Sequence, residues 1–289
     1  MPLATTTMIP RLSRLWTACF GDSKAYTAYI FENLITPGHC VAREDHDTVS
    51  CMLFFEPFTL KGGGQPFKGA YIYGVATDPA YRGRGLSTHL LEEAHTLLQS
   101  AGYSLSVLVP ASESLFDFYA QRGYVPFSDI CRISPDDRDN EIAPRDVALT
   151  QARLQDLYDD RERFFSSSCA YVSWPPSYLE YTGKECAHFG GEVLRVIAGR
   201  EEGYAVCYVS PDAVYIKEMM LSYALFDTAA ASIRKRYGER RCIFNMPADF
   251  GAQYDRPVLP YSMVKWYDKS GCIRRTEAET PPYIAFTLD

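Results

Sequence analysis

The sequence predicts an α/β protein with a mixed sheet, in which parallel and antiparallel strands lie side by side. Three observations predict this class. Short strand-type runs alternate with helical apolar periodicities, a long helix follows a strand directly through a glycine-containing turn, and a similar order of elements recurs more weakly in the second half. The length of 289 residues fits two domains of ordinary size.

The first part of the chain predicts two helices followed by three strands. Apolar residues at helical spacing indicate helices over Ile9–Phe20 and Ala25–Leu34. Strand-type runs, separated by turn-forming residues, follow at His39–Arg43, Val49–Phe55 and Gly69–Ala76. These three consecutive runs are expected to form a meander.

The next part predicts a helix, a strand, a second helix and a further strand. The long helix begins at Leu86, and Gly102 ends it in the manner of a glycine cap. Apolar residues alternate over 105–109 as in a strand. Ser112 can cap a short helix over Glu113–Arg122, before another strand-type run. The N-terminal half is therefore expected to be α/β.

A polar, charged and proline-containing segment at 136–144 predicts a boundary between domains of residues 1–142 and 143–289. Beyond the boundary the order of elements resembles that of the first half. The expected elements are a polar helix at Leu149–Phe165, a β hairpin over Glu192–Leu221, a helix at Leu225–Tyr237, and strands at Cys242–Asn245, Met263–Tyr267 and Tyr283–Leu288.

The composition excludes several classes of protein. Hydrophobic residues make up 47% and charged residues 22%, which is typical of a soluble globular chain rather than a fibre or a disordered one. The net charge of -7 argues against a nucleic-acid partner. No membrane span, secretion signal or metal-ligand spacing is visible, and the nine scattered cysteines fit reduced thiols. A cytoplasmic protein without metal or membrane partner is predicted.

The segment Val75–Ser87, which joins a strand to the long helix, carries the clearest chemical signal. Glycines let successive amides turn toward a ligand, and the start of a helix presents unpaired N–H groups with a partial positive charge. Arg82 and Arg84 add guanidinium groups, which pair well with phosphate oxygens. The turn therefore predicts a pyrophosphate site, and the two common nucleotide-binding glycine motifs are missing from the chain.

This turn resembles the acetyl-CoA signature of the GCN5-related N-acetyltransferase (GNAT) superfamily, Arg/Gln-x-x-Gly-x-Gly/Ala after a strand. The signature is occupied in order by Arg82, Gly83, Arg84, Gly85, Leu86 and Ser87, with Ser87 in place of the usual small residue. The resemblance implies an N-terminal GNAT acyl-CoA N-acyltransferase fold that uses acetyl-CoA as co-substrate. It also implies that the main chain of Val75, Ala76 and Thr77 bonds the pantetheine arm.

A second segment, Ser112–Tyr124, resembles the family element Asn-x-x-Ala-x-x-Phe-Tyr-x-x-x-Gly-Phe/Tyr. The matching residues are Phe118, Tyr119, Gly123 and Tyr124, while Ser112 and Leu115 depart from the pattern. The resemblance implies that Ser112 lies at the coenzyme and that Tyr119 protonates the departing thiolate. The alternative for Tyr119 is a plain core aromatic whose hydroxyl bonds a backbone group.

Acyl transfer to an amine also needs a neutral nucleophile, since an ammonium with a pKa near 10 is only about one part in a thousand neutral at pH 7. The base stays open. Tyr71 and Tyr73 lie on the strand before the turn but are also expected as wall residues, and His39 offers little better. His89 and His95 are expected on the solvated face of the long helix. No cysteine lies in either motif, so direct attack by the amine is favoured over a covalent route.

The second half lacks the glycine turn, since Glu218–Ala224 stands in its place. It resembles the degenerate copy in tandem acetyltransferases of the enhanced-intracellular-survival type and is expected to wall the acceptor cleft. In that family a third domain follows, and the carboxylate at the C-terminus can act as the base. We do not assign this role to Asp289. Trp174–Tyr181 is expected to be an aromatic loop, either lining a substrate entrance or packed at the surface.

The expected function is transfer of an acetyl group from acetyl-CoA to the primary amine of a small molecule or peptide. Two alternatives stay open: a non-catalytic module that binds acyl-CoA, motivated by the departures at Ser87, Ser112 and Leu115, and an aminoacyl transferase using charged tRNA, which the negative charge disfavours. The sequence leaves the oligomeric state open, a homo-oligomer included.

Overall fold

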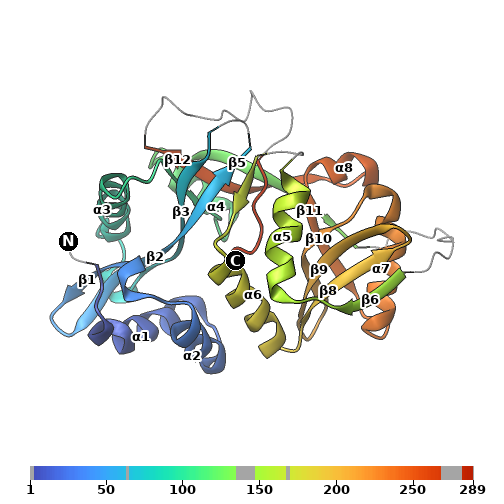
Figure 1. Cartoon of the computed structure of the whole chain (residues 1–289). Helices are drawn as coiled ribbons and strands as arrows, with labels where there is room; N and C mark the ends of the chain where they lie inside the picture. The colour runs from blue at the N-terminus through green and yellow to red at the C-terminus, as the bar shows by residue number, and fades with distance from the viewer. Residues whose placement is uncertain (1–2, 63–64, 135–146, 167–169, 268–281, 289) are drawn as a thin grey trace.

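The computed structural model describes residues 3–62, 65–134, 147–166, 170–267 and 282–288. Over these residues, twelve strands form one continuous mixed sheet in the order β1-β2-β3-β4-β12-β5-β11-β10-β9-β8-β6, with β7 paired to β2 (Figure 1). The mixed α/β class predicted from the sequence is confirmed. The predicted boundary at residue 143 lies outside the described residues.

The first half contains the predicted elements in the predicted order. Its helices are α1 (Ile9–Phe20), α2 (Lys24–Asn33), α3 (Leu86–Ser100) and α4 (Glu113–Ala120), with short 3-10 turns at Thr6–Met8, Pro37–His39 and Pro79–Tyr81. Its strands are β1 (Cys40–Asp45), β2 (Thr48–Lys61), β3 (Phe67–Thr77), β4 (Leu105–Leu108) and β5 (Val125–Ile133). Strands β1, β2 and β3 form the expected antiparallel meander.

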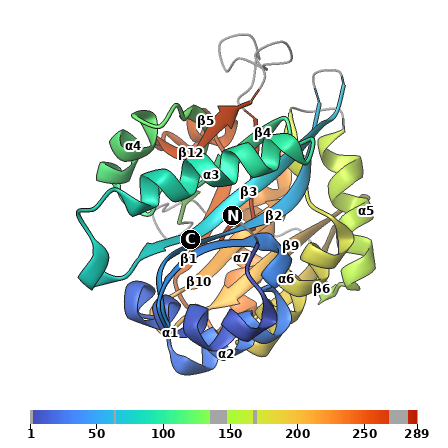
Figure 2. The same ribbon diagram turned by 90° about the vertical axis from the view of Figure 1, so that its left-hand side faces the viewer.

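Helices cover both faces of this meander because side chains alternate along its strands. Met52 and Phe54 of β2 share a core cluster with Trp16 of α1. Their neighbours on β2, Leu53 among them, belong to a second cluster with Leu90 of α3. Figure 2 shows α3 running along one face of the strands, with α1 and α2 grouped apart from it.

The second half adds seven strands and four helices among the described residues. The strands are β6 (Val147–Gln151), β7 (Tyr171–Ser173), β8 (Glu192–Ala198), β9 (Glu201–Val209), β10 (Val214–Met220), β11 (Cys242–Pro247) and β12 (Val258–Trp266). The helices are α5 (Leu154–Phe165), α6 (Pro176–His188), α7 (Tyr223–Arg236) and α8 (Asp249–Tyr254).

Four details differ from the sequence-based expectation. The helix expected from Leu149 begins at Leu154, because residues 147–151 pair with β8 as an edge strand. The expected hairpin is three strands, since a second turn at Gly199 separates β8 from β9. The loop expected over Trp174–Tyr181 is instead mostly the start of helix α6, which begins at Pro176, and its Trp174 is buried. Residues 283–288, expected as a strand, form no strand and make a single described bridge, Tyr171 to Tyr283.

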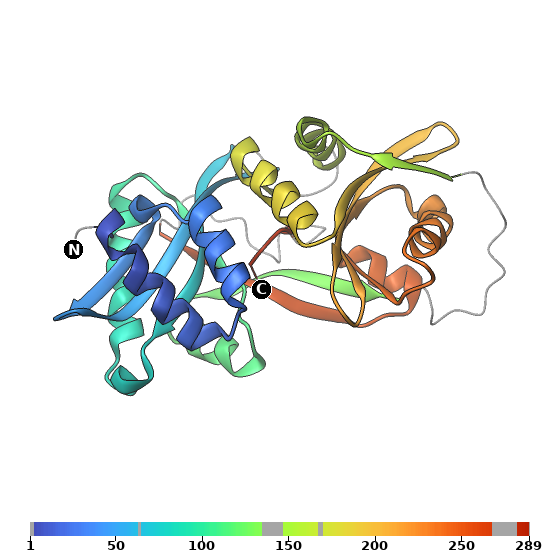
Figure 3. The ribbon, with the colours of Figure 1, turned by 90° about the horizontal axis from the view of Figure 1, so that it is seen from below.

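Strands from the two halves of the chain alternate in the middle of the sheet. β12 pairs antiparallel with both β4 and β5, and β5 in turn pairs with β11. Figure 3 shows β5 and β12 lying side by side as they run between the two ends of the molecule. The largest core cluster likewise joins residues of both halves, for example Phe58 and Trp174, whose ring centroids lie 5.8 Å apart.

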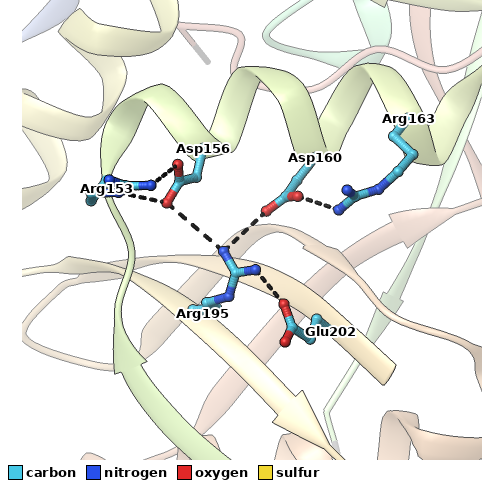
Figure 4. A network of polar contacts seen from close by, with 6 residues as sticks. All are labelled: Arg153, Asp156, Asp160, Arg163, Arg195 and Glu202. Atoms are coloured by element: carbon cyan, nitrogen blue, oxygen red, sulfur yellow. Dashed lines mark hydrogen bonds and ion pairs between the residues drawn. The ribbon is translucent and has the colours of Figure 1, made fainter. Parts of the chain in front are cut away.

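Two kinds of ion pair connect the elements of the second half. Arg161 of α5 and Glu218 of β10 are completely buried, with Arg161 Nε 3.1 Å from Glu218 Oε1. A second network lies at the surface, where Arg195 of β8 bridges Asp156 and Asp160 of α5, each at 3.8 Å (Figure 4). Loss of one partner of the buried pair would leave an uncompensated charge in the core, whereas the surface network faces water and its loss is expected to cost much less.

Candidate active site

A β-bulge interrupts strand β3 at Gly74 and Val75. Two residues of β3 there oppose one residue of β2, because Tyr73 pairs with Phe54 and Ala76 pairs with Met52. Gly74 has a φ of 59°, and a Cβ at this position would lie 2.7 Å from Trp16 and 2.9 Å from Phe54. Only glycine fits both the backbone conformation and this close approach.

The bulge lies where β3 separates from β4. These parallel strands pair over Gly69–Tyr71 of β3 and then diverge, while β3 continues to Thr77. Residues 72–75 of β3 and Leu108 and Val109 at the end of β4 line a cavity of about 530 Å³. A splayed pair of strands leaves main-chain groups of β3 without a β4 partner, so they can bond a ligand that enters the gap.

The phosphate-binding turn predicted from the sequence follows β3 after the short 3-10 turn Pro79–Tyr81. Gly83 and Gly85 have φ values of 77° and 73°, a region that favours glycine. Gly85 precedes the first residue of α3, whose first-turn amides have no partner within the helix. Arg82 and Arg84 are exposed, and their side chains donate to the carbonyl oxygens of Thr77 and Ala80 at 3.2 Å. The turn therefore fits a pyrophosphate.

Tyr119 projects from α4 into the same cavity, with only 7% of its surface exposed. Burial raises the pKa of its phenol to about 12. The side chain consequently keeps its proton throughout the neutral pH range and can act as a donor. Its ring also packs on Phe118 and Tyr124, at 5.2 and 5.7 Å between centroids, so the tyrosine has a core contact as well as a cavity position.

The predicted cofactor residues do not all face this cavity. Val75 lines it, whereas Ala76, Thr77, the turn Arg82–Ser87 and Ser112 lie outside its lining. Ser112 is exposed at the start of α4, and its hydroxyl lies 3.1 Å from that of Ser114. The cavity and the glycine turn are thus adjacent features, joined by the end of β3.

Two of the residues considered as bases are cavity walls. The rings of Tyr71 and Tyr73 stack at 5.5 Å, and both line the cavity. The Tyr73 hydroxyl donates to Glu56 Oε1 at 3.3 Å, and His39 Nδ1 lies 3.5 Å from Glu56 Oε2. Burial and the nearby Glu56 carboxylate raise the pKa of Tyr73 well above its usual value, so this phenol does not ionise near neutrality.

The expectation that His95 is solvated was wrong, although His89 is exposed as expected. His95 is buried, and its Nε2 lies 2.9 Å from the Tyr124 hydroxyl, which also lies 2.9 Å from Ser106 Oγ. Burial lowers the pKa of this imidazole to about 3. The face of α3 that carries His95 is covered by Tyr124 and Tyr267, which helical periodicity alone did not indicate.

The second half closes the cavity opposite β3. Thr182 and Glu185 of α6, Tyr208 of β9 and Lys217 of β10 line it, together with residues 286–288. The Leu288 amide donates to the Tyr71 hydroxyl at 3.0 Å, and the Tyr178 hydroxyl donates to the Phe286 carbonyl at 2.8 Å. Sequence reasoning missed these residues because nothing local relates them to the glycine turn.

Metal-binding clusters and membrane-spanning helices were sought among the described residues as well. No group of three or more His, Cys, Asp or Glu side chains is placed to hold a metal ion in the described parts of the chain. Within the same parts, no helix is both long enough and apolar enough to cross a membrane.

A glycine turn at the start of α3, a bulged strand that splays from its neighbour and a tyrosine facing the gap agree with the GNAT fold that the sequence predicts. The family comparison agrees, because residues 2–127 match the model described as Acetyltransferase (GNAT) domain. This match assigns the N-terminal part of the chain, rather than the whole chain, to the GNAT superfamily. No curated protein matches the sequence.

Solved structures resemble almost the whole chain, each covering 92% of it. They include a probable N-acyltransferase from Enterococcus faecalis V583 (TM-score 0.70, 19% identity, 71% of that chain), a GCN5-related N-acetyltransferase from Anabaena variabilis (0.72, 16%, 72%) and Eis1 from Mycobacterium abscessus (0.69, 14%, 73%). At these identities the likeness shows the fold alone, over both halves of the chain.

Proposed function

We propose that the protein transfers an acetyl group from acetyl-CoA to a primary amine by direct attack, with Tyr119 as the general acid. One observation carries this proposal. Tyr119 lines the same cavity as the bulge of β3, where this strand has no β4 partner, and β3 leads through a short 3-10 turn into the glycine turn at the start of α3. The proposed proton donor thus faces the cavity beside the bulge, and the turn proposed to bind the pyrophosphate follows the C-terminal end of the same strand.

The coenzyme is proposed to bind along this segment. The turn from Arg82 to Ser87 would hold the pyrophosphate through its amides, with Arg82 and Arg84 adding charge. The main chain of Val75, Ala76 and Thr77 would bond the pantetheine arm, and Ser112 would contact the coenzyme at the start of α4. Acetyl-CoA supplies an activated thioester for acyl transfer when it is bound there.

The residues of the chain would then act on the reaction in three ways. An amide of β3 near the bulge polarises the thioester carbonyl by donating a hydrogen bond to its oxygen. Tyr119 gives its phenolic proton to the departing thiolate, for which its raised pKa keeps the proton available. The cavity walls hold the amine close to the reacting carbon, which replaces a bimolecular encounter by an oriented one.

The second half is proposed to be a degenerate GNAT-like domain of residues 143–289, beside a catalytic domain of residues 1–142. Its β10 leads to α7 as β3 leads to α3, but Met219 to Tyr223 contain no glycine. This half would therefore bind no coenzyme and would instead wall the acceptor side of the cavity, to which α6, β9 and β10 contribute.

The test is thiol release from acetyl-CoA across an amine panel, with Tyr119→Phe and Gly85→Glu beside the wild type. Removing the general acid should lower kcat by about 100-fold or more. Gly85→Glu should abolish coenzyme binding, because the left-handed turn and the phosphate charge both oppose a glutamate there.

Two variants serve as matched controls. Tyr215→Phe removes an exposed phenol that bonds Asp212, and Gly102→Glu places the same charge on another left-handed glycine at the far end of α3. Both should retain turnover. Full activity in Tyr119→Phe would remove its role as acid, whereas tight coenzyme binding without acetylation of any amine would favour a non-catalytic acyl-CoA-binding module.

A further inference from the structure

Glu185 is a buried carboxylate in the cavity wall, and the hydrogen bonds that it accepts among the described residues come from phenols. Only 5% of its surface is exposed. The Tyr181 hydroxyl donates to Oε1 at 2.6 Å, and the Tyr208 hydroxyl donates to Oε2 at 2.9 Å. A carboxylate offers about four acceptor positions, so each oxygen keeps one for a further donor.

A buried anion is costly unless opposite charge or enough hydrogen bonds compensate it. The two phenols orient the Glu185 carboxylate without cancelling its charge. The binding of a cationic group from the cavity would supply that compensation. Since an ammonium donates three charge-assisted hydrogen bonds, it matches the acceptor positions that the phenols leave open.

The surroundings of Glu185 favour an amine with a planar or apolar body. The cavity wall near it includes Tyr26 and Phe189, whose ring centroids lie 5.6 Å apart, as well as Tyr208. Trp16 and Phe20 extend this aromatic lining toward the bulge of β3. Aromatic faces attract ammonium groups and bury apolar surface, so the lining suits both parts of such a molecule.

We propose that Glu185 is the specificity-determining residue that binds the ammonium group of an arylalkylamine acceptor in this cavity and accepts its proton, which leaves the neutral nitrogen free to attack the thioester. The inference rests on the proposed function, since it assigns the second substrate of the same site. It also gives the second half of the chain a definite role. Helix α6 supplies the anion, while the N-terminal domain supplies the glycine turn and Tyr119.

The experiment measures binding of 2-phenylethylamine and of its uncharged isostere 2-phenylethanol to the full chain by calorimetry. The wild type should prefer the amine by at least about tenfold, the factor expected from a hydrogen bond to a charged group. Glu185→Gln should weaken amine binding by about 10- to 100-fold and leave alcohol binding unchanged. Tyr208→Phe, which removes one orienting phenol, should lower amine affinity less.

Glu180→Gln is the matched control, because Glu180 lies on the same helix but is exposed and paired with Lys184 at 2.5 Å. It should change neither affinity. Asp22→Asn tests the other carboxylate of the cavity lining, which accepts a hydrogen bond from Trp16. If the preference for the amine survives in Glu185→Gln but is lost in Asp22→Asn, the ammonium binds at Asp22 and the proposal is overturned.

Kinetics separate this inference from the proposed function. If 2-phenylethylamine is acetylated, Glu185→Gln should raise its KM about tenfold or more, with acetyl-CoA affinity unchanged. An unchanged KM would overturn the role of Glu185 and leave the acetyltransferase proposal intact. Conversely, binding of the amine that depends on Glu185, without acetyl transfer, would support the cation site and count against the proposed function.

Discussion

A methyl group added at Gly74 would test the packing of the bulge that shapes the cavity. Gly74→Ala places a Cβ in the left-handed region, which costs about 1–2 kcal/mol. The same Cβ would lie 2.7 Å from Trp16 and 2.9 Å from Phe54, and overpacking of this kind costs about 1–3 kcal/mol. The free energy of unfolding should therefore fall by about 2–5 kcal/mol.

Gly102→Ala is the matched control, because Gly102 has a φ of 78° with no atom within 4 Å of an added Cβ. It should show the backbone cost alone, about 1–2 kcal/mol. Urea unfolding followed by circular dichroism gives both values, and their difference isolates the close approach of the two rings. Equal losses in the two variants would mean that Trp16 and Phe54 yield freely, and the argument for tight packing at the bulge would fail.

Two further perturbations concern buried charge. The unfolded chain takes up a proton at His95 below about pH 6.5, while the folded chain does not until about pH 3. As the pH is lowered below 6.5, the free energy of unfolding should therefore fall by ~1.4 kcal/mol per pH unit, which gives a loss of ~2 kcal/mol at pH 5. In His95→Phe, the free energy of unfolding measured in urea should differ little between pH 7.5 and 5, whereas a variant of exposed His89 should keep the difference. An equal pH dependence in both variants would contradict the assignment of this effect to His95. Arg161→Met leaves Glu218 buried and should cost about 3–5 kcal/mol, against less than about 1 kcal/mol for Arg195→Ala in the surface network, and similar losses in thermal or urea unfolding would refute this ranking.

The elements of the first half were predictable because each buries a single face. Helix α3 shows this clearly, since Leu90, Leu91, Ala94 and Leu98 follow one side and Gly102 ends it. Helix α6 was missed because residues on several of its faces are buried, which removes the single-face periodicity. Pro175 and Pro176 at its start are residues typical of a loop, although a proline at the first helical position is compatible with a helix.

The candidate site likewise contains residues that the sequence predicts and residues that it does not. The glycine turn and Tyr119 belong to local motifs, so the sequence predicts them without knowledge of distant contacts. Gly74 carried a weak signal as a glycine inside a strand-type run, which is typical of a bulge. Glu185 carried none, because the chain brings α6 to the bulge of β3 only through tertiary packing across more than a hundred residues.

The position of β12 between β4 and β5 has a consequence for how the chain matures. During synthesis, β5 is complete at residue 133, but the strand that joins it to β4 begins only at residue 258. Until then, both strands present unpaired edges beside the splayed end of β3, and such edges invite pairing with other chains. The N-terminal domain therefore depends on nearly the whole polypeptide for its final form, and closure of the sheet over this sequence distance is expected to be a late and slow step of folding.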